Sequence, residues 1–184
     1  EAVRQASFNG VSIMTGTGYV SANFSAWGGF ATTILLIVMF IGGCGGSTTC
    51  GIKVFRLQVL ASTAKVQIIR LLRPHAVVLA YYNKRPVSVE VMDSVMGFFY
   101  LFILGFVLIA IMLGMAGLDF VTALSGAATS ISNVGPGLGE VIGADGNFST
   151  LPDSAKWIMS FAMLLGRLEI FTVLVMLNPA FWQR

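Results

Sequence analysis

The stretch Gly42–Gly51, GGCGGSTTCG, decides the fold because of what lies on either side of it. The uncharged run Trp27–Ile41 precedes it, and a basic segment that begins with Ile52-Lys53 follows it. The fifteen residues of that run would rise only about 22 Å as a helix, short of the roughly 30 Å hydrocarbon core of a bilayer. The sequence therefore predicts a membrane crossing that a glycine-rich loop interrupts inside the bilayer. Irregular backbone persists at that depth only where protein buries it or water reaches it, so the loop indicates a pore or a transport site.

The composition is typical of an integral membrane protein. Of the 184 residues, 56% are hydrophobic and 10% are charged, which excludes an ordinary soluble domain. The clearest span is Ser94–Leu118, which has no charged residue and is long enough to cross with some tilt. A second candidate, Trp157–Met176, is interrupted only by Arg167 and Glu169. No set of side chains suited to catalysis can be assembled, so we expect no enzyme.

The distribution of charge predicts the orientation of the chain. Seven of the eleven Lys and Arg residues lie between Lys53 and Arg85, an interval without acidic residues. Four of the eight acidic residues lie between Asp119 and Asp153. The positive-inside rule therefore places segment 53–90 in the cytoplasm and segment 119–151 outside. A basic run can also bind nucleic acid, but between membrane spans we interpret it as an orientation signal and expect no nucleic-acid partner.

Two parts of the chain share one order of elements: a short apolar helix, a glycine turn and a spanning helix. In the first part, a helix predicted over Val3–Thr15 leads into the turn Thr15–Ser21, and the run Trp27–Ile41 follows. In the second part, a helix predicted over Phe120–Ser132 leads into the glycine-rich segment 133–139. A further spanning helix then follows, with a proline in its first turn. This order predicts an internal repeat.

The repeat can be aligned residue by residue. Placing Gly18 over Gly135 also superposes Ser12 on Thr129. Asp119 is well placed to cap the second short helix. Repeats in transporters typically enclose the substrate site at their interface, so the two glycine turns are the candidate site.

A glycine turn that follows a short helix is suited to binding a cation that has lost its water shell. Backbone carbonyl oxygens can replace the water shell of an ion without adding formal charge, and glycine reaches the required backbone angles at low cost. The tripeptide Thr17-Gly18-Tyr19 resembles the Val-Gly-Tyr core of potassium-channel filters, and Asn133-Val134-Gly135 echoes it. The alternative is that both segments are external turns between ordinary spans.

Four segments resemble the Trk/Ktr/HKT superfamily of potassium transporters: GTGYVSA (16–22), GGCGGSTTCGIKV (42–54), SNVGPGLG (132–139) and LLGRLEIFTVLVMLNPAFW (164–182). The resemblance covers essentially the whole chain. It implies an all-α polytopic membrane protein built from repeats of helix, reentrant pore helix and helix, four of which surround one pore. This chain would be the C-terminal half.

The resemblance also implies a division of the chain. Segment 1–72 would be the end of the third repeat, with a pore helix, a filter and a broken inner helix that carries loop 42–51. Segment 73–92 would be a cytoplasmic linker, and segment 93–184 would be the fourth repeat. The parts of that fourth repeat would be an outer helix at 93–118, a pore helix at 119–132, a filter at 133–139, an external loop at 140–151 and an inner helix at 152–177.

By position, the resemblance implies a selectivity filter, a gate and potassium ligands. The filter would comprise Thr15, Gly16, Thr17, Gly18, Tyr19, Ser132, Asn133, Val134, Gly135 and Pro136. The gate would comprise Gly42, Gly43, Cys44, Gly45, Gly46, Ser47, Thr48, Thr49, Cys50, Gly51 and Arg167. The K⁺ ligands would come from Thr17, Gly18, Asn133, Val134 and Gly135. Arg167 would face the pore and contact the loop; the alternative for it is a structural ion pair with Glu169.

The implied function is potassium uptake across the bacterial inner membrane, with this chain as a multi-pass protein whose outer segment is periplasmic. The resemblance further implies a homodimer in the lipid bilayer and a cytosolic nucleotide-binding regulatory subunit of the TrkA type. No cofactor is expected in the chain itself, K⁺ being the transported ion and any nucleotide being bound by the partner. The alternative that stays open is a carrier for another solute, with a site at the bilayer midplane between broken helices.

Overall fold

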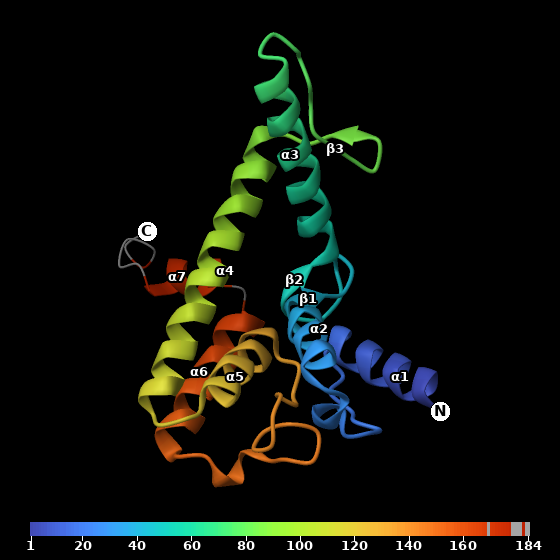
Figure 1. Ribbon diagram of the computed structural model, residues 1–184. Helices are drawn as coiled ribbons and strands as arrows, with labels where there is room; N and C mark the ends of the chain where they lie inside the picture. The colour runs from blue at the N-terminus through green and yellow to red at the C-terminus, as the bar shows by residue number, and fades with distance from the viewer. Residues whose placement is uncertain (169, 178–181, 183–184) are drawn as a thin grey trace.

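The computed structural model describes residues 1–168, 170–177 and 182, and these residues are predominantly helical (Figure 1). Short turns and two pairs of two-residue strands join the helices. The α-helices are α1 (Ala2–Met14), α2 (Gly29–Phe40), α3 (Val54–Leu72), α4 (Val89–Met115), α5 (Phe120–Ser132), α6 (Asp153–Arg167) and α7 (Ile170–Leu177). The other elements are the 3₁₀ turns η1 (Phe24–Trp27) and η2 (Phe148–Thr150) and the strands β1 (Ile41–Gly42), β2 (Ile52–Lys53), β3 (Tyr81–Tyr82) and β4 (Arg85–Pro86).

Helix α5 lies between two apolar clusters, and nearly all of it is buried. On one side Ala127 packs in a cluster with Phe102 of α4 and Met159 of α6. On the other side Ala128 packs in a cluster with Ile13 of α1 and Met39 of α2. The small residues of α5 let several helices approach its backbone closely. Helix α5 therefore joins α4 and α6 on one side to α1 and α2 on the other.

The longest helix begins and ends earlier than the outer helix expected at 93–118. Helix α4 runs from Val89 to Met115, and the Ser88 side chain caps its first turn. Glu90 lies in that first turn, where the positive end of the helix dipole favours a carboxylate. The glycine at position 117 has a positive φ of +91° and ends the helix. The charge-free run Ser94–Leu118 therefore predicted that a helix exists here but not where it begins and ends.

The second short helix has the bounds that its capping pattern predicts, Phe120–Ser132. Asp119 accepts a hydrogen bond from the Thr122 backbone N–H at 3.1 Å. Hydrogen bonds from the Thr122 side chain and backbone lower the pKa of Asp119 below its ordinary value, so the capping carboxylate stays ionised at neutral pH. The first short helix, Ala2–Met14, lies within one residue of its expected range.

The inner helix predicted over 152–177 is not continuous. Helix α6 ends at Arg167 and α7 begins at Ile170. Leu168 bonds back to Leu164 O, but its backbone angles of φ −85° and ψ 3° turn the chain out of the helical direction. The break at Leu168 falls between Arg167 and Glu169, the two charged residues of this otherwise apolar run, a signal that the prediction of one continuous helix did not use.

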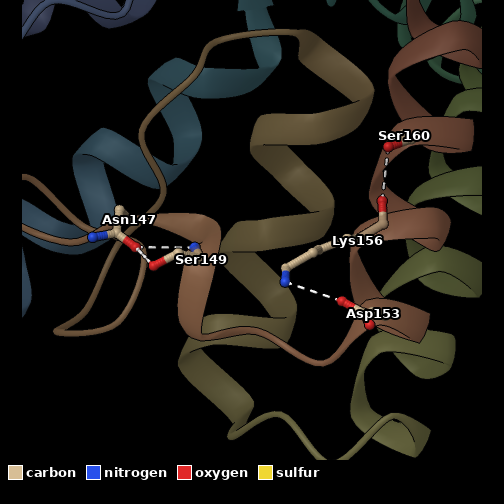
Figure 2. Close-up of polar contacts among 5 residues, drawn as sticks. All are labelled: Asn147, Ser149, Asp153, Lys156 and Ser160. Carbon is tan, nitrogen blue, oxygen red and sulfur yellow. Dashed lines mark hydrogen bonds and ion pairs between the residues drawn. The ribbon is translucent and has the colours of Figure 1, made fainter.

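The start of α6 also differs from expectation. Pro152 is the N-cap residue and lies just before the first turn rather than in it. In the preceding loop the Asn147 side chain caps the 3₁₀ turn η2, and at the start of α6 Lys156 Nζ donates to Asp153 Oδ1 at 3.1 Å (Figure 2). These local bonds fix where the loop between α5 and α6 ends and α6 begins.

The loop from α5 to α6 and the connection from α3 to α4 lie at opposite ends of the molecule (Figure 1). Helix α3 packs along α4. Among the described residues, α4 is the one helix that is both long and apolar enough to cross a membrane, while α2 and α5 are shorter apolar helices. The cytoplasmic assignment of 53–90 and the external assignment of 119–151 stay predictions.

Candidate functional site

Two glycine turns follow the two short helices. We call Thr15–Tyr19 the first turn and Ser132–Pro136 the second turn. Gly18 has a φ of +75° and Gly135 a φ of +117°, values that side chains with a Cβ rarely adopt. In the second turn Asn133 is left-handed as well, and it ends α5. The sequence uses glycine at the aligned positions because the backbone requires it there.

The two turns are held to their helices by the same hydrogen bond. Thr17 N–H donates to Ser12 O at 2.9 Å, and Val134 N–H donates to Thr129 O at 3.0 Å. In the alignment of the repeat these donors and acceptors are equivalent. The next residue in each turn is a glycine that donates to the same helix residue: Gly18 N–H to Ser12 O, and Gly135 N–H to Thr129 Oγ1. The internal repeat is therefore present in the backbone geometry, although few residues are identical.

The two turns meet in space. A Cβ built on Gly18 would overlap the carbonyl oxygen of Val134, and one built on Gly135 would lie 3.6 Å from Gly18 Cα. A Cβ on Gly16 would lie 3.6 Å from the Asn133 carbonyl oxygen. Consecutive carbonyl oxygens of the second turn therefore face the backbone of the first turn. Two carbonyl oxygens of the second turn therefore lie beside glycines of a segment more than a hundred residues earlier in the chain.

Hydroxyl groups at equivalent positions fix both turns. Thr129 Oγ1 accepts a hydrogen bond from Gly135 N–H at 3.0 Å, and Ser12 Oγ donates to Tyr19 O at 2.7 Å. The sequence alignment superposes these two residues but assigns them no role. A hydroxyl residue six positions before each glycine was the signal that could have identified them.

Two asparagines add further support. Asn133 Nδ2 donates to Met163 O at 3.0 Å, which ties the second turn to α6. Asn9 is fully buried in α1 and exchanges two hydrogen bonds with Ser21, each 3.1 Å long. Buried amide groups of this kind stabilise one backbone conformation, because breaking any of these bonds leaves a polar group unpaired.

The glycine loop, Gly42–Gly51, is closed at its neck. Strands β1 and β2 pair in parallel there. A Cβ on Gly42 would overlap Cys50 O, and Gly51 has a φ of +81°. Glycine at both ends of the loop therefore allows the two backbone segments to lie against each other, so helices α2 and α3 are separated by a compact loop and not by a kink.

The glycine loop contacts both the first turn and the last helix pair. Thr49 Oγ1 donates to Thr15 O at 3.2 Å. Arg167 Nη1 donates to the Thr48 carbonyl oxygen at 2.6 Å, across more than a hundred residues of sequence. The acidic residue considered as an alternative partner of Arg167, Glu169, lies outside the described residues. Arg167 thus contacts the loop, and its role in a gate stays a prediction.

Other predicted site residues lie in differing environments. Pro136 Cδ would be 3.2 Å from a Cβ on Gly18, so it belongs to the same contact. Tyr19 is exposed, whereas Ser132 is buried and its hydroxyl has no hydrogen-bond partner among the described residues. Cys44 and Cys50 are free thiols.

Carboxylate, imidazole and thiolate ligands do not gather in the part of the chain that the structure describes: it holds no group of three or more His, Cys, Asp or Glu residues placed to bind a metal ion. The polar atoms found where the two turns meet are the carbonyl oxygens of Asn133 and Val134, and their role as cation ligands stays a prediction. Such oxygens suit a weakly held alkali-metal ion better than a tightly held divalent ion.

Comparison with known families and structures gives a consistent result. A family model described as "TrkH: Cation transport protein" matches residues 1–184. The Trk system potassium uptake protein TrkI of Halomonas elongata is 48% identical over 180 residues, which cover 98% of this chain and 37% of the relative. The Trk system potassium uptake protein TrkH of Escherichia coli K12 is 37% identical over 181 residues, which cover 98% of this chain and 37% of the relative.

A solved structure has the same fold. The crystal structure of the potassium transporter TrkH from Vibrio parahaemolyticus matches with a TM-score of 0.88 and 40% sequence identity, over 97% of this chain and 37% of that chain. The chain therefore spans less than two fifths of the length of these relatives.

Proposed function

Because the chain belongs to the TrkH family of cation transport proteins, we propose that it forms part of a potassium uptake pathway in the bacterial inner membrane. The first and second turns would form two segments of the selectivity filter. Backbone carbonyl oxygens would hold K⁺ there. A family of transport proteins is not one of enzymes, in agreement with the expectation from sequence. The proposed ligand residues are Thr17, Gly18, Asn133, Val134 and Gly135.

The observation that carries this proposal is the contact between the two turns. The carbonyl oxygen of Val134 lies close enough to Gly18 to exclude a side chain there, and the carbonyl oxygen of Asn133 lies within van der Waals contact of a Cβ built on Gly16. Oxygens presented in this way can replace the water of an alkali-metal ion. The hydrogen bond from Gly135 N–H to Thr129 Oγ1 orients the second turn for this task. The relatives named as potassium uptake proteins support K⁺ as the ion.

We further propose that the glycine loop and Arg167 gate the pathway. The guanidinium group holds the loop through Thr48 O, and a fixed positive charge on the route raises a barrier to cations. The contact from Thr49 to Thr15 O places the loop next to the first turn. A movement of the loop away from Arg167 would then open the route.

The proposed filter can be tested by ⁸⁶Rb⁺ uptake into proteoliposomes that contain the full-length protein. In the wild type, external K⁺ should block uptake much more strongly than Na⁺. Gly135→Ser should retain uptake but lose most of this discrimination, because a Cβ at Gly135 fits the space but strains a φ of +117°. Absence of Rb⁺ uptake by a well-folded wild type with its cytosolic partner present would remove the potassium proposal and favour a carrier for another solute.

The proposed gate predicts a gain of flux. Arg167→Ala should raise ⁸⁶Rb⁺ uptake about tenfold in the absence of a cytosolic partner, because it removes a charge-assisted hydrogen bond that holds the loop. Lys84→Ala, an exposed change in the turn between β3 and β4, serves as the control and should leave uptake unchanged. If Arg167→Ala folds, inserts and conducts like the wild type, Arg167 is only structural.

The partners follow from the same proposal. We propose a homodimer in the lipid bilayer, regulated by a cytosolic nucleotide-binding subunit of the TrkA type, with segment 53–90 on the cytoplasmic side. The names of the relatives as proteins of a Trk system support the existence of partner subunits. The division into a third and a fourth repeat belongs to this proposal as well.

A further inference from the structure

Asn9 of α1 holds the part of the chain that returns from the first turn. Its side chain is fully buried, although most of α1 is exposed. Asn9 Nδ2 donates to Gln5 O at 2.8 Å and to Ser21 Oγ at 3.1 Å, and Asn9 Oδ1 accepts from Ser21 N–H at 3.1 Å. Both protons and the oxygen of the amide group are therefore used. Asn9 belongs to neither the proposed filter nor the proposed gate.

Ser12 binds the same returning segment closer to the glycine. It lies three residues after Asn9 and therefore on the same face of α1. The Ser12 hydroxyl donates to Tyr19 O at 2.7 Å, and the Ser12 carbonyl oxygen accepts from the N–H groups of Thr17 and Gly18. Helix α1 thus holds the chain from within the first turn to the residue two positions beyond its end.

The second turn has an equivalent bond that comes from a different helix position. Ser21 aligns with Leu138 when Gly18 is placed over Gly135. Ser125 Oγ of α5 donates to Leu138 O at 3.2 Å. A side chain of the short helix therefore binds the third residue after the glycine in both turns. Because the two helix residues do not align, the two turns share the geometry of this bond and not the identity of the residue that makes it.

We propose that Asn9 is a positioning residue that sets the selectivity of the first turn for K⁺ over Na⁺. This role rests on the proposed function, in which the carbonyl oxygens of Thr17 and Gly18 are ligands. Carbonyl oxygens that cannot close in on the smaller Na⁺ favour K⁺. Only two residues separate Gly18 from Ser21, so the bonds that fix Ser21 also limit the movement of Gly18.

The exposure of Ser21 allows this role to be separated from folding. Its N–H and hydroxyl groups can bind water when the bonds to Asn9 are lost, so Asn9→Leu, which has nearly the same volume, should fold. Asn9→Asp is the conservative variant, because its carboxyl oxygens can accept from Ser21 N–H and from the Ser21 hydroxyl, which then donates. Thr63→Val is the matched control. The Thr63 hydroxyl is buried without a hydrogen-bond partner among the described residues, so its removal breaks no bond.

The first measurement is hydrogen–deuterium exchange of the full-length protein in nanodiscs, read by mass spectrometry. The peptide that contains Ser21 should exchange about tenfold faster in Asn9→Leu, because its N–H loses the bond to Asn9. Peptides from α4 should be unchanged, and Asn9→Asp and Thr63→Val should exchange like the wild type. Unchanged exchange at Ser21 in Asn9→Leu overturns the proposal, and so does faster exchange throughout the protein.

The second measurement is ⁸⁶Rb⁺ uptake into proteoliposomes in the presence of K⁺ or Na⁺. The ratio of the Na⁺ to the K⁺ concentration that halves uptake should fall about tenfold in Asn9→Leu, while maximal uptake stays within about twofold of the wild type. Asn9→Asp should restore the ratio. Ser21→Ala removes only the hydroxyl partner, should lower the ratio several-fold, and decides the question should Asn9→Leu not fold.

The outcomes of the uptake measurement separate this proposal from the proposed function. A ratio that Asn9→Leu leaves unchanged, or that Thr63→Val lowers equally, overturns the role of Asn9 while the potassium pathway stands. Absence of Rb⁺ uptake by the wild type overturns the proposed function, and the selectivity role of Asn9 with it.

Discussion

Gly18→Ala is expected to abolish potassium-selective uptake in the full-length protein. Two effects act together at this position. A Cβ would overlap the carbonyl oxygen of Val134 and lie 3.2 Å from Pro136 Cδ, and the backbone has a φ of +75° that an L-residue adopts only at a cost of roughly 1–2 kcal/mol. Either turn must move, so the oxygens proposed to hold K⁺ lose their spacing. ⁸⁶Rb⁺ uptake blocked by K⁺ should fall at least about tenfold, which corresponds to about 1.4 kcal/mol.

The matched control is Gly10→Ala. Gly10 lies within α1, and no atom lies within 4 Å of a Cβ built there. Alanine is also the better helix former by about 1 kcal/mol, so this variant should fold and transport like the wild type. Gly18→Ala should impair uptake more than Gly135→Ser does, since only backbone strain acts at Gly135. Normal K⁺-selective uptake by Gly18→Ala would show that the contact between the turns is not part of the filter.

Gly166→Leu is expected to destabilise the packing behind the second turn. A Cβ at Gly166 would overlap Ile131 O, lie 2.8 Å from the carbonyl carbon of that residue and lie 3.0 Å from Asn133 Nδ2. Helix α6 therefore reaches the end of α5 only because position 166 has no side chain. Overpacking against backbone costs about 3 kcal/mol or more, since the backbone cannot rotate out of the way.

The measurement is the midpoint of thermal unfolding of the detergent-solubilised full-length protein, together with its size-exclusion profile. Gly166→Leu should lower the midpoint by several degrees or prevent recovery of a monodisperse protein. Gly114→Leu is the control, since Gly114 also lies in a helix, α4, and has no atom within 4 Å of a built Cβ. Gly166→Ala should fall between the wild type and Gly166→Leu. Equal midpoints for the two leucine variants would contradict the close contact of α5 and α6.

Features that depend on local physics were predictable from the sequence. The second short helix and its Asp119 cap follow from residues three positions apart, which interact whenever the helix forms. The glycine turns follow from a backbone that demands a positive φ at Gly18 and Gly135. The loop Gly42–Gly51 between α2 and α3 follows from the glycines after the apolar run, whereas its place inside the membrane stays a prediction. Each of these is a property of a few adjacent residues.

Helix ends were harder to predict. The start of α4 at Val89 depends on a cap by Ser88 that lies among charged residues, so hydropathy placed the helix several residues too late. The break between α6 and α7 at Leu168 is marked in the sequence only by the charged residues on either side of it, which do not by themselves end a helix. Hydrophobicity measures transfer of side chains out of water, whereas the end of a helix depends on individual hydrogen bonds and backbone angles.

By itself, the sequence determined the class of the protein, the repeated order of its elements and the glycines that its turns require. Only the tertiary structure decided which atoms meet across the chain. The Val134 carbonyl oxygen lies against Gly18, the Arg167 guanidinium group donates to Thr48 O, and the α6 backbone at Gly166 lies against α5. Local preferences act over a few residues and are encoded in their identity. Contacts between residues more than a hundred positions apart depend on the packing of all the helices at once, which no short stretch of sequence specifies.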